Sequence, residues 1–297
     1  MFPTLPSEIG RLRHVAVTHA RDAFVNQATI DGQWQGLGFT ARPDFGRAVE
    51  QHEAFITVLR DAGAAVHLLA PGPGTTLDAI YARDASLACP QGMVLCAMGK
   101  AARAAEPASQ ANAFAGISPA VPVLGRVEPP GCIEGGDVVW LTPRTLAVGV
   151  GYRTNAEGAT QLRRLLGHSI DDLIEVPLPH WRGPGDVLHL MSLLSPVDRD
   201  LAVVYSPLMT VPFRQRLSAL GFRFVEVPGE EFDSMGVNVL ALAPRRCVML
   251  KGNPRTRAAL EQAGATVLEY DGSEISVKGC GGPTCLTRPL VRAATDQ

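Results

Sequence analysis

The sequence predicts an α/β protein in which one strand–strand–helix–strand unit is repeated five times to form a closed, pseudo-symmetric, five-bladed α/β propeller. Three observations support this prediction. Short apolar strands alternate with amphipathic helices along the 297 residues. A glycine follows several of these helices, as is common at helix C-termini. The pattern also recurs at a spacing of roughly 60 residues, which is typical of a repeat architecture.

Small repeated units cannot bury their own apolar faces, so they stack against their neighbours. Each crossover between parallel strands should be right-handed. We therefore expect residues 1–297 to form a single closed domain, with helices on the outside, rather than two separate domains.

The first unit combines two apolar strands with one amphipathic helix: strand 14–18, helix 45–60 and strand 65–69. The second unit is less regular and has strands 93–96 and 121–124 on either side of an alanine-rich segment. Short apolar strands of this kind are typical of sheets that helices cover.

The last three units are the most regular, and each again has a strand, a helix and a second strand. Their predicted ranges are 146–150, 155–166 and 173–176; 201–205, 212–220 and 222–227; and 247–250, 255–263 and 266–270.

The composition is that of an ordinary globular protein, with 46% hydrophobic residues and a formal net charge of −2. Scattered Lys and Arg in a near-neutral chain argue against a nucleic-acid partner. No apolar run approaches the ~18 residues of a membrane helix, and the first residues lack the features of a signal peptide. We therefore expect a cytoplasmic protein without membrane contact.

Six cysteines are spread along the chain: Cys89, Cys96, Cys132, Cys247, Cys280 and Cys285. In a cytoplasmic protein these thiols should be reduced. No pair has the C-x-x-C spacing and the histidines do not cluster, so we expect no structural zinc site.

Five polar residues occupy equivalent positions, each in a loop after a unit and near the start of the next apolar strand. These residues are Asp84, Glu134, His189, Asn238 and Cys285, and they are separated by 47 to 55 residues. Equivalent positions in a closed repeat lie around one axis, so the five side chains should converge at its centre. Such a set does not suit an apolar core, because buried charges are costly unless they are paired. It therefore predicts a functional site.

Each of the five residues also has a purely structural interpretation. Asp84 and Glu134 could cap turns. His189 could be a core histidine with satisfied hydrogen bonds, and Asn238 could bond the backbone of its own loop. Cys285 could be a small buried hydrophobe. Their matching place in five repeats is what favours the functional interpretation.

The chemistry that these groups suit is nucleophilic attack on a cation. A thiol needs its thiolate stabilised at neutral pH, and two nearby carboxylates would oppose this unless the substrate itself is cationic. A guanidinium is a planar cation that pairs with carboxylates. Asp84 and Glu134 would hold its nitrogens while Cys285 attacks its central carbon. His189 would then protonate the leaving amine and activate water against the covalent thiouronium.

Six short stretches, spread in order over nearly the whole chain, carry a resemblance to a known family. They are Ala48-Val49-Glu50-Gln51-His52, Glu134-Gly135-Gly136-Asp137, Arg153-Thr154-Asn155-Ala156-Glu157-Gly158-Ala159, Val187-Leu188-His189-Leu190, Pro254-Arg255-Thr256-Arg257 and Gly281-Gly282-Pro283-Thr284-Cys285. In these stretches the chain resembles the guanidino-group-modifying (pentein) superfamily, and most closely the bacterial dimethylarginine dimethylaminohydrolases.

The resemblance implies a five-bladed α/β propeller and assigns roles to the candidate residues. Cys285 would be the nucleophile and His189 the general acid and base. Asp84 and Glu134 would bind the guanidinium. Arg153 would bind the carboxylate of an arginine-like substrate.

Two positions depart from the pattern of the dimethylargininases. Arg83 stands where those enzymes carry a glutamate, and Arg83-Asp84 is more similar to arginine deiminases and amidinotransferases. Met98 stands where a second carboxylate-binding arginine is expected, and Lys100 or Arg103 could replace it. Arg83 and Asn238 complete the candidate substrate-binding residues.

The loop at 22–43 is longer than in those relatives, where this region is a lid over the substrate. Gly32, Gly36 and Gly38 would allow such a loop to fold over the site and exclude water.

We therefore predict a cysteine-dependent hydrolase that cleaves a C–N bond of a guanidino substrate, with N-methylated arginine giving citrulline and an alkylamine. The alternative within the superfamily is an arginine deiminase or an amidinotransferase that acts on another guanidino compound. The alternative of another class is a non-catalytic propeller that only binds a partner. The mechanism needs no cofactor and no metal, although zinc could bind Cys285 and His189 as an inhibitor. The expected partner is a small guanidino molecule, and the chain could form a homodimer.

Overall fold

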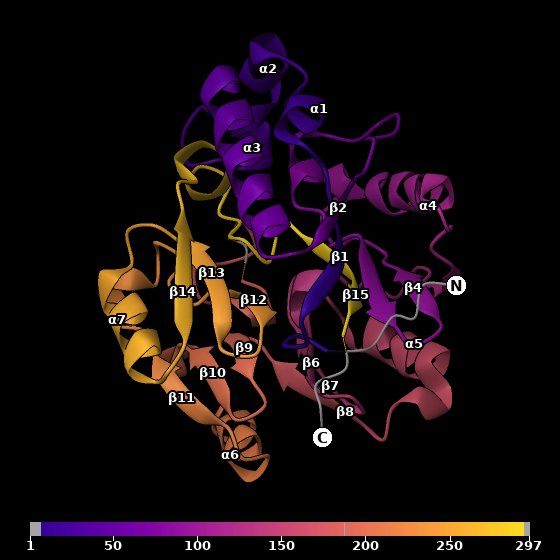
Figure 1. Cartoon of the computed structure of the whole chain (residues 1–297). Coiled ribbons are helices and arrows are strands. Elements are labelled where there is room, and N and C mark those ends of the chain that lie inside the picture. The colour runs from indigo at the N-terminus through magenta and orange to yellow at the C-terminus, as the bar shows by residue number, and fades with distance from the viewer. Residues whose placement is uncertain (1–6, 187, 294–297) are drawn as a thin grey trace.

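Fifteen strands form five three-stranded sheets in the part of the chain that the computed structural model describes, residues 7–186 and 188–293. Figure 1 shows these sheets following one another around the molecule. In each sheet an antiparallel pair is followed by a helix and by a third strand that runs parallel to the second. This is the predicted unit, and all five copies have it.

Four of the units are contiguous in the chain, and a helix makes the crossover to the parallel strand in each of them. Their elements are β3 (Ser86–Cys89), β4 (Gly92–Leu95), α4 (Glu106–Gly116) and β5 (Val123–Arg126); β6 (Val138–Thr142), β7 (Thr145–Val150), α5 (Ala156–Leu166) and β8 (Asp172–Pro177); β9 (Leu194–Asp198), β10 (Leu201–Val204), α6 (Val211–Ala219) and β11 (Arg223–Glu226); and β12 (Leu240–Ala243), β13 (Arg246–Leu250), α7 (Pro254–Gln262) and β14 (Thr266–Tyr270).

The fifth sheet joins the two ends of the chain. The last strand, β15 (Arg288–Arg292), pairs antiparallel with the first strand, β1 (Leu12–Val17). The chain then passes through α3 (Phe45–Asp61) to β2 (Ala65–Leu68), which lies parallel to β1. The C-terminal strand thus completes the unit that the N-terminal strand begins.

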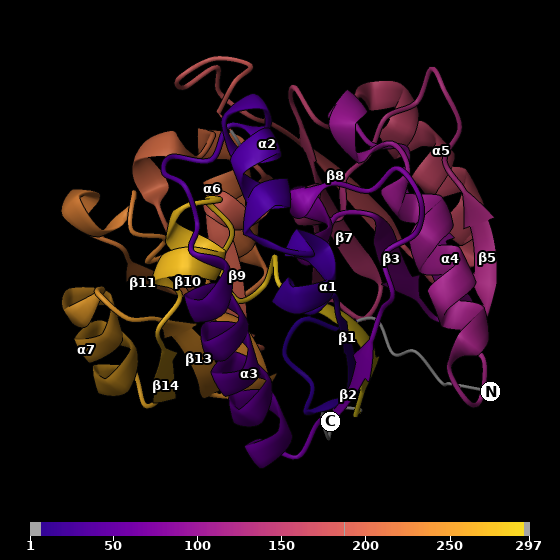
Figure 2. The ribbon, with the colours of Figure 1, turned by 90° about the horizontal axis from the view of Figure 1, so that it is seen from above.

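Helix α3 shows why the crossover helices lie on the outside. Its buried residues recur three or four positions apart and include Ala48, His52, Phe55 and Leu59, while its other face is polar. Figure 2 shows α3, α4, α5 and α7 at the periphery of the molecule, where each helix can cover sheet on one side and meet solvent on the other.

The sequence predicted the strands and crossover helices to within a few residues, but it set the candidate site residues too close to their strands. Asp84 precedes β3 by two residues, Glu134 precedes β6 by four and Cys285 precedes β15 by three. Glu134 and His189 are instead followed by short 3₁₀ turns. The turns interrupt the extended backbone, so these side chains are presented by loops at the strand entrances.

The predicted loop at 22–43 is mostly helical, which corrects the sequence-based interpretation. It forms α1 (Ala20–Phe24) and α2 (Gln27–Leu37). The side chain of Asn26 caps α2 by accepting a 2.9 Å hydrogen bond from the backbone N–H of Thr29. Gly38 ends the helix with φ of 84°, a conformation that glycine adopts readily.

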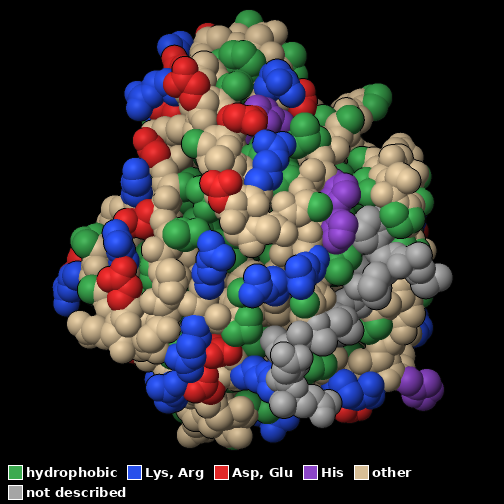
Figure 3. Space-filling model, viewed as in Figure 1, with side chains coloured by type: hydrophobic (Ala, Val, Ile, Leu, Met, Phe, Trp, Pro, Cys, Tyr) green, Lys and Arg blue, Asp and Glu red, His purple; other side chains and the backbone are tan. Residues whose placement is uncertain are grey.

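Acidic and basic side chains are interspersed over the face that Figure 3 shows. Among the described residues, α3 is the longest helix with 17 residues, and only one of its faces is apolar. None of the helices in that part of the chain combines the length and the apolar composition that a membrane crossing requires.

Candidate active site

A pocket of about 470 Å³ brings together three of the five residues that were expected to converge. Asp84, His189 and Cys285 all line it, although their loops lead into three different sheets. Glu134 is fully buried and holds the His189 ring. Asn238 lines an adjoining pocket and contacts the sulfur of Cys285. The volume lies within the range of small-molecule sites.

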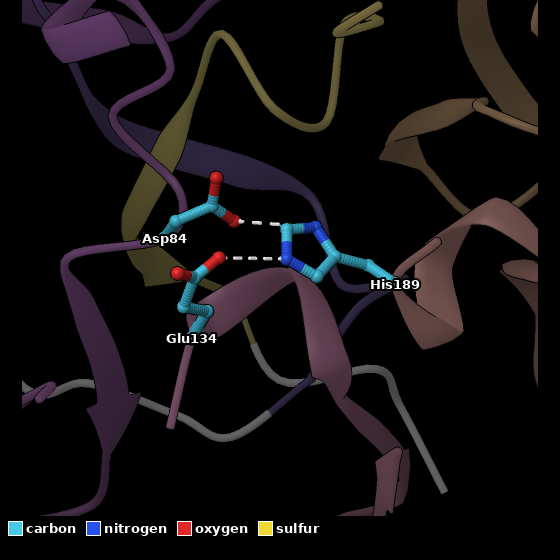
Figure 4. Close-up of side chains that lie close together, drawn as sticks. All are labelled: Asp84, Glu134 and His189. Carbon is cyan, nitrogen blue, oxygen red and sulfur yellow. Dashed lines mark hydrogen bonds and ion pairs between the residues drawn. The ribbon is translucent and has the colours of Figure 1, made fainter. Parts of the chain in front are cut away.

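Glu134 fixes the orientation of His189. Its Oε2 lies 2.8 Å from His189 Nε2 and accepts a 2.9 Å hydrogen bond from Arg153 Nη1. Its Oε1 accepts a hydrogen bond from the backbone N–H of Lys100 at 3.1 Å. Figure 4 shows the carboxylates of Glu134 and Asp84 facing the imidazole from the same side.

These contacts suggest a further role for Glu134, beside the guanidinium binding that stays a prediction. The residue is fully buried, and both of its carboxylate oxygens already accept hydrogen bonds from the protein. Its position is that of a carboxylate that orients the imidazole of His189.

Asp84 is one of the carboxylates that line the pocket, together with Asp78 and Asp186. Its Oδ2 accepts a 2.6 Å hydrogen bond from Arg103 Nη1, and its Oδ1 accepts one of 2.9 Å from the backbone N–H of Gly136. Its Oδ1 also lies 3.8 Å from His189 Nδ1. Arg103 is itself fixed by Glu106, which accepts two 2.8 Å hydrogen bonds from it. This bidentate pairing holds a negative charge at a defined place in the pocket wall.

Gly136 allows the close approach of these groups. A Cβ atom at this position would overlap His189 Nδ1 and would lie 2.8 Å from Asp84 Oδ1. Only a residue without a side chain lets the backbone come this near to both groups.

The surroundings of His189 keep its imidazole protonated near neutral pH. Burial lowers its pKa, but the charges of Asp84 and Asp137 and the hydrogen bond to Glu134 outweigh burial and raise the pKa to about 9. Burial in turn raises the pKa of Glu134, but the hydrogen bond and charge of His189 hold that pKa well below its usual range. The two side chains therefore form an imidazolium–carboxylate pair.

Cys285 is a thiol whose pKa is raised, mainly by burial and also by the charge of Asp84. Two hydrogen bonds oppose this shift: Asn238 Nδ2 lies 3.4 Å from the sulfur and Thr284 Oγ1 lies 3.9 Å from it. The thiol therefore needs an additional cation nearby in order to ionise.

Asn238, predicted to bind substrate, lines the adjoining pocket rather than the larger one. Its Oδ1 accepts hydrogen bonds from the backbone N–H and the hydroxyl of Thr284, at 3.0 and 2.8 Å. Together with its bond to the sulfur, these contacts make Asn238 the residue that holds the Cys285 loop.

Arg83 is also not in the pocket, so its predicted role in substrate binding is not supported. Its side chain is 1% exposed, pairs with Glu8 at 3.3 Å and donates a 3.1 Å hydrogen bond to the carbonyl of Thr284. It lines a separate cavity. The turn at residues 82–85 thus places the two neighbouring side chains in different cavities.

Three cations surround the pocket. Arg153 lines it as predicted, although one of its nitrogens is engaged by Glu134. Arg103 is buried and committed to two carboxylates, so it does not replace the arginine that is missing at Met98. Lys100, with a side chain 22% exposed, is the more accessible of the two proposed replacements.

The helical segment that precedes Gly38 covers one side of the pocket. Residues 35–38 line it. Lys100 Nζ ties this segment to the wall by donating hydrogen bonds to the carbonyl of Leu37 at 2.7 Å and to Asp78 Oδ2 at 2.6 Å. Sequence reasoning did not identify Asp78, because its loop shows no repeat position.

An adjoining pocket of about 310 Å³ shares His189 and Cys285 with the first. Its other walls include the apolar side chains Trp181, Met191 and Phe232. The imidazole and the thiol thus lie between a charged pocket and a more apolar one.

Asp84, Glu134 and His189 each offer one ligand atom within 4.8 Å of the others, which is the spacing of a metal site. The same carboxylates, however, accept hydrogen bonds from Arg103 and Arg153. These cations oppose binding of a second positive charge, so the donor set suits proton transfer better than metal coordination.

Comparison with known families and structures gives a consistent result. The family model described as "N,N dimethylarginine dimethylhydrolase, eukaryotic" matches residues 39–292. The arginine deiminase of Mycobacterium marinum is 34% identical over 193 residues, which are 54% of this chain and 46% of that protein. The chain therefore spans about half the length of this curated relative.

Two solved structures are similar over most of the chain. The DDAH from Pseudomonas aeruginosa, complexed with citrulline, has a TM-score of 0.74 at 24% identity and covers 95% of this chain and 100% of its own. An amidinotransferase from Microseira wollei has a TM-score of 0.77 at 16% identity and covers 98% of both chains. At these identities the likeness concerns the fold alone.

Proposed function

Because the chain belongs to the N,N dimethylarginine dimethylhydrolase family, we propose that it is a cysteine-dependent hydrolase that cleaves a C–N bond of a guanidino substrate. The observation that carries this proposal is the single pocket lined by Asp84, His189 and Cys285. The pairing of β1 with β15 supports the further proposal that residues 1–297 form one closed, five-bladed α/β propeller.

The substrate cation completes the charge balance of the pocket. Asp84 accepts hydrogen bonds from the guanidinium nitrogens, because its carboxylate faces the pocket in a fixed orientation. The bound cation then lies beside Cys285 and offsets the burial that raises the pKa of the thiol. Substrate binding thereby drives release of the thiol proton to solvent and yields the thiolate.

In the first step the thiolate of Cys285 attacks the central guanidinium carbon. The C–N bond to the leaving amine breaks as His189 passes its proton to that nitrogen. Nδ1 is the atom suited to this transfer, because Glu134 engages Nε2. The products of the step are a free amine, a neutral imidazole and a thiouronium on the sulfur.

In the second step the neutral His189 accepts a proton from water, and the resulting hydroxide attacks the thiouronium carbon. The C–S bond then breaks as the added hydroxyl releases its remaining proton to solvent and becomes the carbonyl of the ureido product. This product leaves, and Cys285 returns as a thiolate beside an imidazolium. Neither a metal nor a cofactor takes part.

We propose N-methylated arginine as the substrate, with citrulline and an alkylamine as products. The apolar pocket beside His189 and Cys285 supports this choice, because it offers space next to the reacting atoms for methyl groups on the leaving nitrogen. Arginine itself is the second candidate, supported by the 34% identity to an arginine deiminase.

A panel of arginine, mono- and dimethylarginines, agmatine and guanidino acids tests the proposal through the ureido product and the released amine. We expect Cys285→Ser to abolish turnover without unfolding the protein. Cys132→Ser is the matched control, because that thiol does not line either pocket. Unimpaired amine release by the Cys285 variant contradicts the mechanism.

The same panel separates the alternatives. An amidinotransferase forms a new guanidine only when glycine or lysine is added as an acceptor, whereas a hydrolase forms the ureido product without one. A non-catalytic binding protein gives no product, and guanidines do not protect its Cys285 from alkylation. The cytoplasmic location and the homodimer stay predictions, and light scattering of the purified chain tests the latter.

A further inference from the structure

A third cavity lies beside the strands that follow the catalytic loops, and it shares no lining residue with the two active-site pockets. It is lined by Ala88 of β3, Trp140 of β6 and Leu290 of β15. The catalytic loops precede these same strands, so the strands separate the cavity from the active site. We call it the arginine cavity, because Arg83, Arg288 and Arg292 also line it.

The three guanidinium groups of this cavity are almost completely buried. Arg83 is 1% exposed, Arg288 is 4% exposed and Arg292 is 2% exposed. Among the described residues, Glu8 is the one carboxylate in the lining, and it pairs with Arg83 at 3.3 Å. In that part of the chain, three positive charges thus share one negative charge.

Several guanidinium nitrogens in the cavity have no hydrogen-bond partner. Within residues 7–186 and 188–293, these atoms are Arg83 Nη2, Arg288 Nε, and both Nε and Nη2 of Arg292. The remaining guanidinium nitrogen of Arg292, Nη1, does have partners. It donates hydrogen bonds to the backbone carbonyls of Gly10 and Ala241 at 2.7 and 2.8 Å. Backbone carbonyls therefore anchor Arg292, but donors remain unpartnered on all three arginines that line the cavity.

This excess of buried positive charge favours the binding of an anion. A guanidinium does not lose its proton in proteins, and a buried charge without a counter-charge is costly. Burial and the neighbouring positive charge of Arg83 lower the pKa of Arg288 to about 9. Burial also lowers the pKa of Arg292, to about 10. A water molecule could satisfy donors but would not balance the charge.

We propose that the arginine cavity is a binding site for a small inorganic anion of the size of chloride. The space open to the centre of a water-sized sphere is about 20 Å³, which is enough for one occupant of about the size of water. The arginines that line this space carry four unpartnered nitrogens, and the charge of the occupant lowers the net charge of the described lining residues from +2 to +1.

The anion site is connected to the active site through Arg83. The backbone N–H of this residue donates a 3.1 Å hydrogen bond to the carbonyl of Cys285, and its side chain donates to the carbonyl of Thr284. An anion that holds the Arg83 side chain therefore stabilises the loops that present Asp84 and Cys285.

Thermal unfolding of the full chain at constant ionic strength tests the proposal, with chloride replacing gluconate, which is too large for the cavity. We expect the unfolding midpoint to rise with chloride and to saturate. A midpoint that is the same in both anions at every concentration overturns the proposal, since general screening acts without regard to the identity of the anion.

Two variants change the charge of the cavity in opposite directions. Glu8→Gln leaves three arginines without the carboxylate, so the chloride concentration for half-saturation should fall by about tenfold or more. Arg292→Met removes one cation, so that concentration should rise by a similar factor. Arg164→Met is the control, because Arg164 is exposed on α5, and it should leave the concentration unchanged.

Crystals of the wild-type chain grown in bromide give a second readout that does not depend on stability. We expect one anomalous peak within hydrogen-bond distance of Arg83 and Arg292, and its loss in the Arg292 variant. Absence of the peak, or an equal chloride response in the Glu8 and Arg292 variants, refutes the anion site.

Discussion

The charge state of His189 depends on carboxylates on both sides of its ring. Glu134 engages Nε2 at 2.8 Å, and Asp84 lies 3.8 Å from Nδ1. The resulting pKa of about 9 keeps a buried imidazole cationic at pH 7. A residue with this pKa serves first as an acid, which fits a reaction that begins by expelling an amine.

The pH dependence of kcat/KM should follow from this arrangement. The reactive form of the free enzyme has a thiolate and an imidazolium, while both groups are protonated at neutral pH because both pKa values are raised. We expect kcat/KM to rise by about tenfold per pH unit and to level off near pH 9, where His189 begins to lose its proton. A profile that is flat between pH 6 and 8 contradicts this assignment.

Glu134→Gln provides the internal check on that profile. The substitution removes the charge and weakens the hydrogen bond that raise the pKa of His189. The pH at which kcat/KM levels off should therefore move downward, together with the titration of the imidazole followed by NMR. A lower rate with an unchanged titration indicates that Glu134 acts on the structure alone.

Gly136→Ala should reduce kcat by about 100-fold or more, because a misplacement of about 1 Å at reacting groups has effects of this size. The added Cβ overlaps His189 Nδ1 and crowds Asp84. Gly116→Ala, at a position with no atoms nearby, is the matched control and should retain activity. Circular dichroism and the unfolding midpoint show whether the Gly136 variant is folded, and full activity in a folded variant contradicts the proposed geometry.

At the scale of elements, regular periodicity made the crossover helices predictable. Helix α3 has a continuous buried face, and its position was correct to within one residue. Helix α2 was missed because it contains Gly32 and Gly36 and buries only Ile30, so it has little apolar pattern. Its position depends on contacts with distant loops, which the sequence alone does not reveal.

The site residues that the sequence predicted differ in the same way from those that it missed. His189 and Cys285 were found because they occupy repeated positions, whose convergence follows from the fold. The bidentate pair of Arg103 and Glu106 had no such signal, since it lies at the start of α4 and reaches Asp84 only through packing. The periodicity of a sequence does not predict tertiary contacts of this kind.

Lys100→Met tests the connection between α2 and the pocket wall. The ammonium bonds the carbonyl of Leu37 at the C-terminal end of α2, where a cation is favourable, and Asp78 on the wall. Its loss should raise KM by about tenfold, the effect of about 1.4 kcal/mol, with a smaller change in kcat. Lys251→Met, at an exposed position, is the control. An unchanged KM shows that α2 needs no such link.

At the scale of the molecule, each sheet contributes one loop to the same centre. Asp84, Glu134, His189, Asn238 and Cys285 precede β3, β6, β9, β12 and β15, respectively. Because β15 and β1 pair antiparallel, like the hairpin strands of the other units, the break between the chain ends lies where the other units have a hairpin turn.

A circular permutant should therefore fold. Joining Gln297 to Met1 and opening the chain between the exposed residues Glu128 and Pro129, which lie between β5 and β6, keeps every unit intact. We expect turnover to persist and the unfolding midpoint to change by less than about 5 °C, since small local losses shift it by this order. Opening the chain between the buried residues Val203 and Val204 in β10 is the control that should fail. Loss of folding in the first permutant contradicts closure through β1 and β15.

The late position of the cysteine has a consequence for biosynthesis. Cys285 and the strand that anchors it leave the ribosome after the acids and the imidazole. A nascent chain consequently has no nucleophile in place until β15 has been synthesised and can pair with β1. Truncated translation products should therefore be inert toward guanidines, even when their earlier sheets have already folded.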